Sequence, residues 1–131
     1  MFGKPVSRKL IEMGNQVRVL VRNVDKAQKI FRNDAEIVGG SAFTRENVRS
    51  AMAGCDAVHV SLPHRVELIA MQHVVDFAKI TGLERITYIS ATTVCEDNRW
   101  FDLIDVKLRA ESLLQSSGIA NTIFCPTWAM G

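Results

Sequence analysis

A bound small molecule is expected to contact four residues: Ser90, Ala91, Thr92 and Lys107. The first three form a small polar run directly after residues 86–89, an apolar stretch that predicts a buried strand. Ligands of an open α/β sheet bind beyond the carboxyl ends of its strands, so this run lies where a cofactor would bind. There, the hydroxyl of Ser90 or Thr92 could orient a substrate, and the ammonium of Lys107 could position a cofactor.

Lys107 lies inside the apolar arc of a helix predicted to begin at Leu103. At about 100° per residue, its side chain projects within roughly 20° of Leu114 and roughly 40° of Leu103. One interpretation is a lysine whose stem covers apolar surface while its ammonium reaches water. The other is a cation directed across the carboxyl edge of the sheet. The helical pattern alone leaves both open.

The run ISATTV, its polar loop and the segment VKLRAESLLQSSGIANTIFCPTW resemble the atypical short-chain dehydrogenase/reductase superfamily, especially its NmrA-like, NAD(P)H-binding members. The resemblance covers nearly the whole chain. It implies a dinucleotide cofactor and a contact between Lys107 and the nicotinamide ribose. It also implies that Ser90 and Thr92 belong to a catalytic centre together with Lys107.

One part of the short-chain dehydrogenase active centre is absent from this sequence. Those enzymes carry a tyrosine four residues before the lysine, one helical turn away, so that the cation lowers the pKa of the phenol. Leu103 occupies that position, and Tyr88, the only tyrosine, lies inside the predicted strand. Three interpretations stay open: an oxidoreductase that works without the tyrosine, a regulator that senses NADP(H) and acts through a protein partner, and an incomplete domain that binds nothing.

Arg22 and Lys26 predict the choice of cofactor. Arg22 ends a predicted strand at residues 16–22, and Lys26 lies one helical turn into the next helix. In Rossmann domains an acidic residue at this place binds the ribose 2′-hydroxyl, whereas a nearby arginine accommodates a 2′-phosphate. A surface arginine at a strand end is the alternative. Because the strand end has no carboxylate and phosphate prefers such a cationic pair, we expect NADP rather than NAD.

The resemblance implies further cofactor contacts through the backbone and small side chains. Gly3 matches the last glycine of a GxxGxxG turn, where the backbone approaches the pyrophosphate at a helix N-terminus. Ser41 follows Gly39 and Gly40 in the loop that approaches the adenine in relatives, and a simple glycine turn explains that loop equally well. Three residues after the next strand lie against the ribose and pyrophosphate in relatives: Ser61, Leu62 and Pro63.

Helices and strands alternate along the whole chain. Helices are expected at residues 4–13, 25–31, 44–53, 65–81 and from 103 onward, and strands at 16–22, 35–38, 56–62, 86–89 and 119–125. This alternation predicts an α/β fold, a Rossmann-like doubly wound parallel sheet with helices on both faces. Because no linker or repeat interrupts it, residues 1–131 are expected to form a single, partial NAD(P)-binding domain.

The usual first strand is missing from this pattern, since Gly3 and the helix that follows it come directly after Met1 and Phe2. In a 3-2-1-4-5-6 sheet that strand is the central one, so strands 17–21 and 57–61 should face a gap with unpaired backbone groups. We therefore expect an N-terminally truncated domain, either distorted so that these strands approach each other or completed by another chain. It should bind cofactor weakly or not at all, and its exposed edges would allow a homo-oligomer. Relatives build the substrate pocket mostly after the sixth strand, so no substrate is assigned.

Composition excludes several other classes of protein. Sixteen basic against fourteen acidic residues leave a net charge of +2, too small to indicate nucleic acid or an anionic membrane as partner. Three cysteines without a CxxC pair predict reduced thiols, and three histidines without ligand spacing predict no metal site. No apolar run reaches the roughly 18 residues of a membrane span, so a cytoplasmic location is expected.

Overall fold

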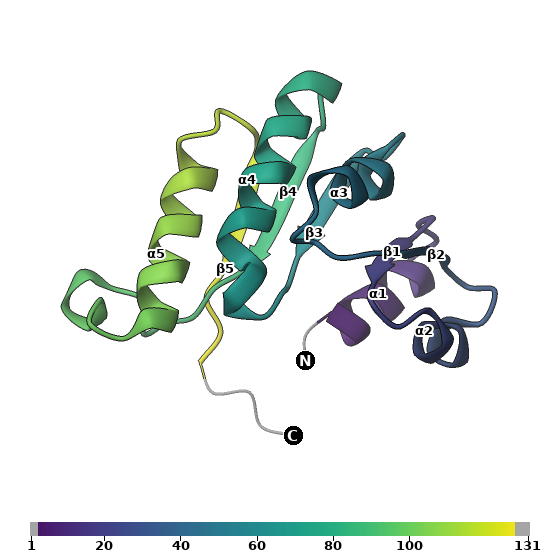
Figure 1. The fold of residues 1–131 in the computed structure, drawn as a ribbon, viewed down its shortest axis with the longest axis horizontal. Helices are drawn as coiled ribbons and strands as arrows, with labels where there is room; N and C mark the ends of the chain where they lie inside the picture. Colours follow the sequence, from purple (N-terminus) through teal and green to yellow (C-terminus); the bar gives the residue numbers. More distant parts are fainter. Residues whose placement is uncertain (1–2, 128–131) are drawn as a thin grey trace.

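A computed structural model of the chain describes residues 3–127. Within them, helices and strands alternate as predicted, and the ends of the strands differ from the predicted ends by at most two residues (Figure 1). The elements are α1 (Gly3–Glu12), β1 (Arg18–Val21), α2 (Val24–Phe31), β2 (Glu36–Gly39), α3 (Arg45–Met52), β3 (Ala57–Val60), α4 (His64–Thr81), β4 (Arg85–Ile89), the 3₁₀ turn η1 (Glu96–Asn98), α5 (Asp102–Gln115) and β5 (Asn121–Phe124).

The strands are all parallel, and they form two sheets. β1 pairs with β2, and the second sheet has the order β3-β4-β5. Among the described residues, one edge of β1 and one edge of β3 therefore have no strand partner. A single strand between them would join the two sheets into one of order β2-β1-x-β3-β4-β5. This confirms the prediction of a Rossmann-like parallel sheet that lacks its central strand.

The hydrophobic core lies almost entirely on the side of the three-stranded sheet. Helices α3, α4 and α5 pack beside one another over it (Figure 1). Helix α4 packs deeply, with buried residues spread along its length: Glu67, Ala70, Met71, Val74, Val75, Phe77 and Ala78. By contrast, α1 has no buried residue and β1 is only half-buried along its length. The β1–β2 half consequently has little core of its own.

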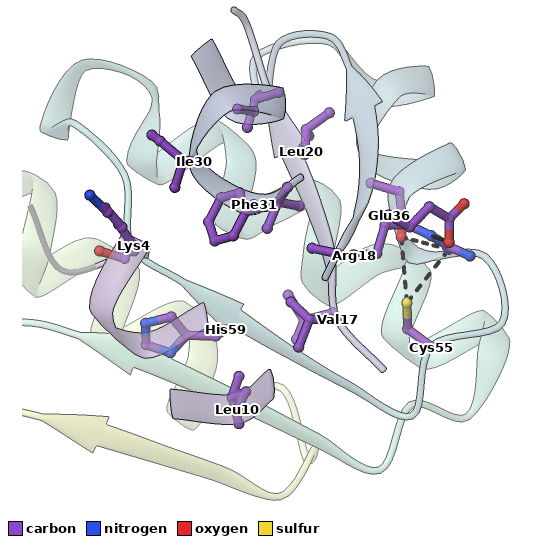
Figure 2. A pocket seen from close by; sticks show the side chains of 18 of the residues that line it. Lys4, Leu10, Val17, Arg18, Leu20, Ile30, Phe31, Glu36, Cys55 and His59 are labelled. Atoms are coloured by element: carbon purple, nitrogen blue, oxygen red, sulfur yellow. Dashed lines mark hydrogen bonds and ion pairs between the residues drawn. The ribbon is translucent and has the colours of Figure 1, made fainter. Parts of the chain in front are cut away.

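Arg18, at the start of β1, attaches the small sheet to α3. Its guanidinium donates to Glu36 Oε2 on β2 at 2.9 Å, and to the backbone oxygens of Ala51 and Ala53 at 3.0 and 2.6 Å. Figure 2 shows this side chain beside Glu36 and Cys55. Carbonyl groups at the end of a helix lack intrahelical partners. The one guanidinium therefore donates to free carbonyls at the end of α3 and also neutralises Glu36.

A cavity of about 1900 Å³ separates the two sheets. The strand edges contribute apolar side chains to its lining: Val17, Val19, Val21, Val58 and Val60. In Figure 2, Lys4 and Leu10 of α1, Ile30 and Phe31 of α2, and His59 of β3 surround the same space. Its location between two unpaired parallel edges is the location expected for the absent strand.

An apolar strand and a turn containing two glycines, joined upstream of Gly3, should therefore stabilise the protein. Such a strand would pair with both open edges and cover the half-buried residues of β1. We expect a rise of several degrees in the midpoint of thermal unfolding measured by circular dichroism, at roughly 4 °C per kcal/mol. The control is an extension of equal length with alternating lysine and glutamate, and equal midpoints for the two extensions would contradict this interpretation.

Candidate functional site

The most buried polar cluster lies at the carboxyl end of β4, where α4 and α5 meet it. Lys107 Nζ on α5 lies 3.0 Å from Glu67 Oε1, 3.4 Å from Glu67 Oε2 and 3.2 Å from the carbonyl oxygen of Ile89. The side chain of Glu67 is 1% exposed and that of Lys107 is 13% exposed. The three donors of the ammonium thus face three acceptors, and its charge is neutralised by a buried carboxylate.

Tyr88 completes this cluster from within β4. Its hydroxyl donates to Glu67 Oε1, and its ring centre lies 5.3 Å from Lys107 Nζ. Burial first, and the bonded Glu67 carboxylate second, raise the pKa of the phenol far above its usual value of 10.0. Tyr88 therefore stays a neutral hydrogen-bond donor, and because it is fully buried its hydroxyl does not reach a ligand.

Glu67 was not among the residues predicted for the site, although the sequence contains a signal for it. Glu67 shares one helical stripe with Met71, Val74 and Ala78, at spacings of four, seven and eleven residues, and all four are buried. A carboxylate on the buried stripe of a helix requires a partner. Its place in the first turn of α4 also suits the dipole of that helix, which favours negative charge there.

Ser90 lies beside this cluster and is itself held by a side chain. It is 3% exposed, and its hydroxyl donates to Glu111 Oε1, one helical turn beyond Lys107 on α5. Burial, and then the Glu111 carboxylate, raise the pKa of the nearby Cys125 thiol, while Lys107 lowers it. Thr92 is exposed instead, and its backbone N–H donates to the Pro126 oxygen at 3.2 Å. Of the two predicted hydroxyls, only that of Thr92 faces solvent.

Arg22 and Lys26 are exposed at the carboxyl end of β1, and neither forms an ion pair with another residue in 3–127. The side chain of Asn23 caps α2 by accepting from Lys26 N at 2.9 Å, which brings the first turn of the helix to the strand end. The nearest carboxylate along the chain is Asp25, in the same turn. Two cations without partners at this place fit an anionic group such as a phosphate.

The predicted cofactor residues divide into two groups in space. Five of them line the cavity between the sheets: Gly3, Arg22, Lys26, Ser61 and Leu62. A Cβ added to Gly3 would meet no atom within 4 Å, so the backbone at the start of α1 is open to a ligand. Five others lie away from the cavity lining: Ser41, Pro63, Ser90, Ala91 and Lys107. The cavity thus reaches the amino end of α1 and the carboxyl ends of β1 and β3, whereas the Lys107 cluster lies at the end of β4.

The glycine loop after β2 has a structural explanation in this chain. A Cβ at Gly40 would lie 2.6 Å from Asn47 Cγ, and one at Gly39 would lie 2.8 Å from Val24 Cγ2. Ser41 Oγ accepts from the backbone N–H of Phe43 at 3.2 Å, as in a local turn. Close packing therefore accounts for both glycines without a ligand, and the contact of Ser41 with adenine stays a prediction.

Residues 3–127 contain no group of three or more histidine, cysteine or acidic side chains arranged to hold a metal ion. No helix in that range is both long enough and apolar enough to cross a membrane.

Comparison with known proteins gives a family and a set of folds. A family model described as NAD(P)H-binding matches residues 1–130. A photosystem II assembly factor of Guillardia theta is 27% identical over 94% of this chain and 42% of its own length. A ketoreductase of Stigmatella aurantiaca, which acts on a farnesylated dihydroquinoline oxide, is 27% identical over 75% of this chain and 33% of its own length. The chain thus spans less than half the length of these relatives.

Solved structures show the same fold. An NADPH-dependent quinone oxidoreductase from Escherichia coli, complexed with NADPH, matches with a TM-score of 0.75 at 22% identity, over 97% of this chain and 46% of that one. A triphenylmethane reductase from Citrobacter sp., complexed with NADP(H), has a TM-score of 0.72 at 21% identity, over 91% of this chain and 44% of that one. At these identities the likeness establishes the fold alone.

The Tyr88–Glu67 hydrogen bond predicts an alkaline limit to stability. The pKa of Tyr88 is raised in the folded state, so its contribution is complete below the unfolded value of 10.0 and declines as the pH rises above it. Because Tyr88 is the only tyrosine, phenolate absorbance at 295 nm reports on it alone. We expect this absorbance to appear only together with the loss of helical circular dichroism. A phenolate that formed at pH 10 in folded protein would contradict the buried hydrogen bond.

Proposed function

Because the chain belongs to the NAD(P)H-binding family, we propose that it binds NADP(H) and is part of an NADP(H)-dependent oxidoreductase of the atypical short-chain type. One observation carries the choice of NADP(H): the cations of Arg22 and Lys26 line the cavity at the end of β1 without ion-pair partners in the described chain. They are placed to bind a 2′-phosphate. The NADP(H) complexes of the E. coli and Citrobacter enzymes support the same choice.

The other predicted residues take positions along the dinucleotide. In this proposal, the open backbone at Gly3 faces the pyrophosphate, and Ser41 lies toward the adenine. Residues 61–63 run along the ribose. Ser90, Ala91 and Lys107 hold the nicotinamide end beyond β4, with Lys107 bonded to the ribose. Thr92, exposed at the same strand end, orients the substrate. The bound dinucleotide supplies the hydride, and the side chains of this region bind and orient.

The second candidate function is an NADP(H)-sensing regulator that acts through a protein partner. The observation that favours it is that the usual proton donor is missing from its position. Leu103 stands where the family has a tyrosine, and the phenol of Tyr88 is buried and bonded to Glu67. The similarity to a photosystem II assembly factor supports the same alternative.

We also propose a cytoplasmic location and self-association. The thiols of Cys55, Cys95 and Cys125 are free, which suits a reducing compartment. The unpaired edges of β1 and β3 would allow two copies to pair.

Replacing Arg22 with alanine should separate the two cofactors. Calorimetric titration should show that NADPH binds more tightly than NADH to the unaltered protein. Arg22→Ala should weaken the binding free energy of NADPH by about 1.5–3 kcal/mol, the range for a hydrogen bond to a charged group. The binding of NADH should be nearly unchanged. Lys29→Ala is the control, because Lys29 is an exposed cation of α2 that does not line the cavity. Equal losses for NADPH and NADH would remove Arg22 from the 2′-phosphate site.

Turnover distinguishes the enzyme from the regulator. If the chain is the cofactor domain of an oxidoreductase, NADPH absorbance at 340 nm should fall in the presence of a panel of quinones and carbonyl compounds. Saturable binding of NADPH without any oxidation would support the regulator. Absence of binding to NADPH, NADP and NADH would reject both.

A further inference from the structure

We propose that Glu67 is a positioning residue, which fixes the ammonium of Lys107 at the end of β4 for the nicotinamide half of the cofactor. This inference rests on the proposed function and assigns a role to a residue that sequence reasoning did not select. Its basis is the buried cluster of Glu67, Tyr88 and Lys107, which joins α4, β4 and α5 through one carboxylate.

Three neighbours restrict the position of the ammonium. Glu67 holds it through both carboxylate oxygens, the Ile89 carbonyl holds it from the last residue of β4, and the ring of Tyr88 lies beneath it. A free lysine side chain loses rotamer entropy when it is ordered. That loss has already occurred here when the cofactor arrives, which favours binding.

Glu67 is in turn held in place from its other side. The hydroxyl of Tyr88 donates to Oε1, and the carboxylate is 1% exposed, so it cannot exchange Lys107 for water. Of the three acceptors around the ammonium, the Ile89 carbonyl stands at the end of the strand. A ribose hydroxyl can replace that one hydrogen bond while both bonds to Glu67 remain.

The Glu67–Lys107 pair and the cations Arg22 and Lys26 act differently on a charged ligand. Because Glu67 neutralises Lys107, this ion pair can orient a ligand through hydrogen bonds but attracts an anion only weakly. Arg22 and Lys26 have no such partner in residues 3–127 and supply the attraction to phosphate. The sign of a mutational effect therefore distinguishes positioning from simple attraction. Removing the negative charge of Glu67 would strengthen the binding of an anionic ligand if charge alone mattered, and would weaken it if position matters.

The test compares two probes by calorimetry: NADPH, and adenosine 2′,5′-bisphosphate, which carries the adenosine and 2′-phosphate but no nicotinamide. Glu67→Gln should lower the affinity for NADPH by about tenfold, which corresponds to the loss of one hydrogen bond to a charged group. The affinity for the bisphosphate should change by no more than about twofold. Lys107→Met should do the same. Glu67→Gln combined with Lys107→Met should be no weaker than Lys107→Met alone, because the two residues act as one unit.

A second variant separates the folding role of the pair from its binding role. Glu67→Leu combined with Lys107→Met replaces the buried ion pair by apolar side chains, a change that commonly preserves stability. It should unfold in urea close to the unaltered protein and yet bind NADPH as weakly as Lys107→Met. NADPH affinity that recovered in this variant would overturn the proposal.

Three further results have a definite meaning. NADPH affinity unchanged or raised by Glu67→Gln would overturn this inference alone. Equal weakening of both probes would also overturn it, because a general structural loss would then explain the effect. If the unaltered protein bound neither probe, the proposed function would fail and the inference with it.

Discussion

The hydrogen bonds of the buried Glu67 carboxylate join α4, β4 and α5 in the three-stranded half of this molecule. A charge removed from water is stable only if its partners are held in place, and here the partners come from a strand and a second helix. The same ion pair that fixes α4 and α5 over β4 therefore sets the position of the cation at the sheet edge. The apolar core packs the two helices over the sheet, and this contact sets where the ammonium of Lys107 lies.

The two ends of the proposed dinucleotide site differ in their electrostatics. At the end of β1 the cations are exposed and unpaired within the described residues, and at the end of β4 the cation is buried and neutralised. Long-range attraction belongs to the first end and orientation to the second. This division suits a cofactor whose phosphate carries the charge while its nicotinamide requires a defined placement.

Much of the fold followed from periodicity, and much of the site did not. The alternation of elements was predictable because apolar spacing reflects local geometry, and the family resemblance predicted the absent central strand. The partner of Lys107 was not predictable, since Glu67 interrupts an apolar pattern forty residues earlier and only the tertiary structure brings the two together. The hydrogen bond from the Ser90 hydroxyl to Glu111 was likewise not evident from the sequence, and the contact of Ser90 with a ligand stays a prediction.

The gap between the sheets has a consequence for cooperativity. Among the described residues no strand pairing connects β1–β2 to β3–β5, so the small sheet is attached mainly through Arg18, α3 and the chain itself. Its opening exposes little core and leaves the ion pair on the other side intact. We therefore expect unfolding in two stages, which a single free energy of unfolding for residues 3–127 would not describe. A central strand is accordingly more than a surface for a ligand: it is the element that would make the two halves unfold as one.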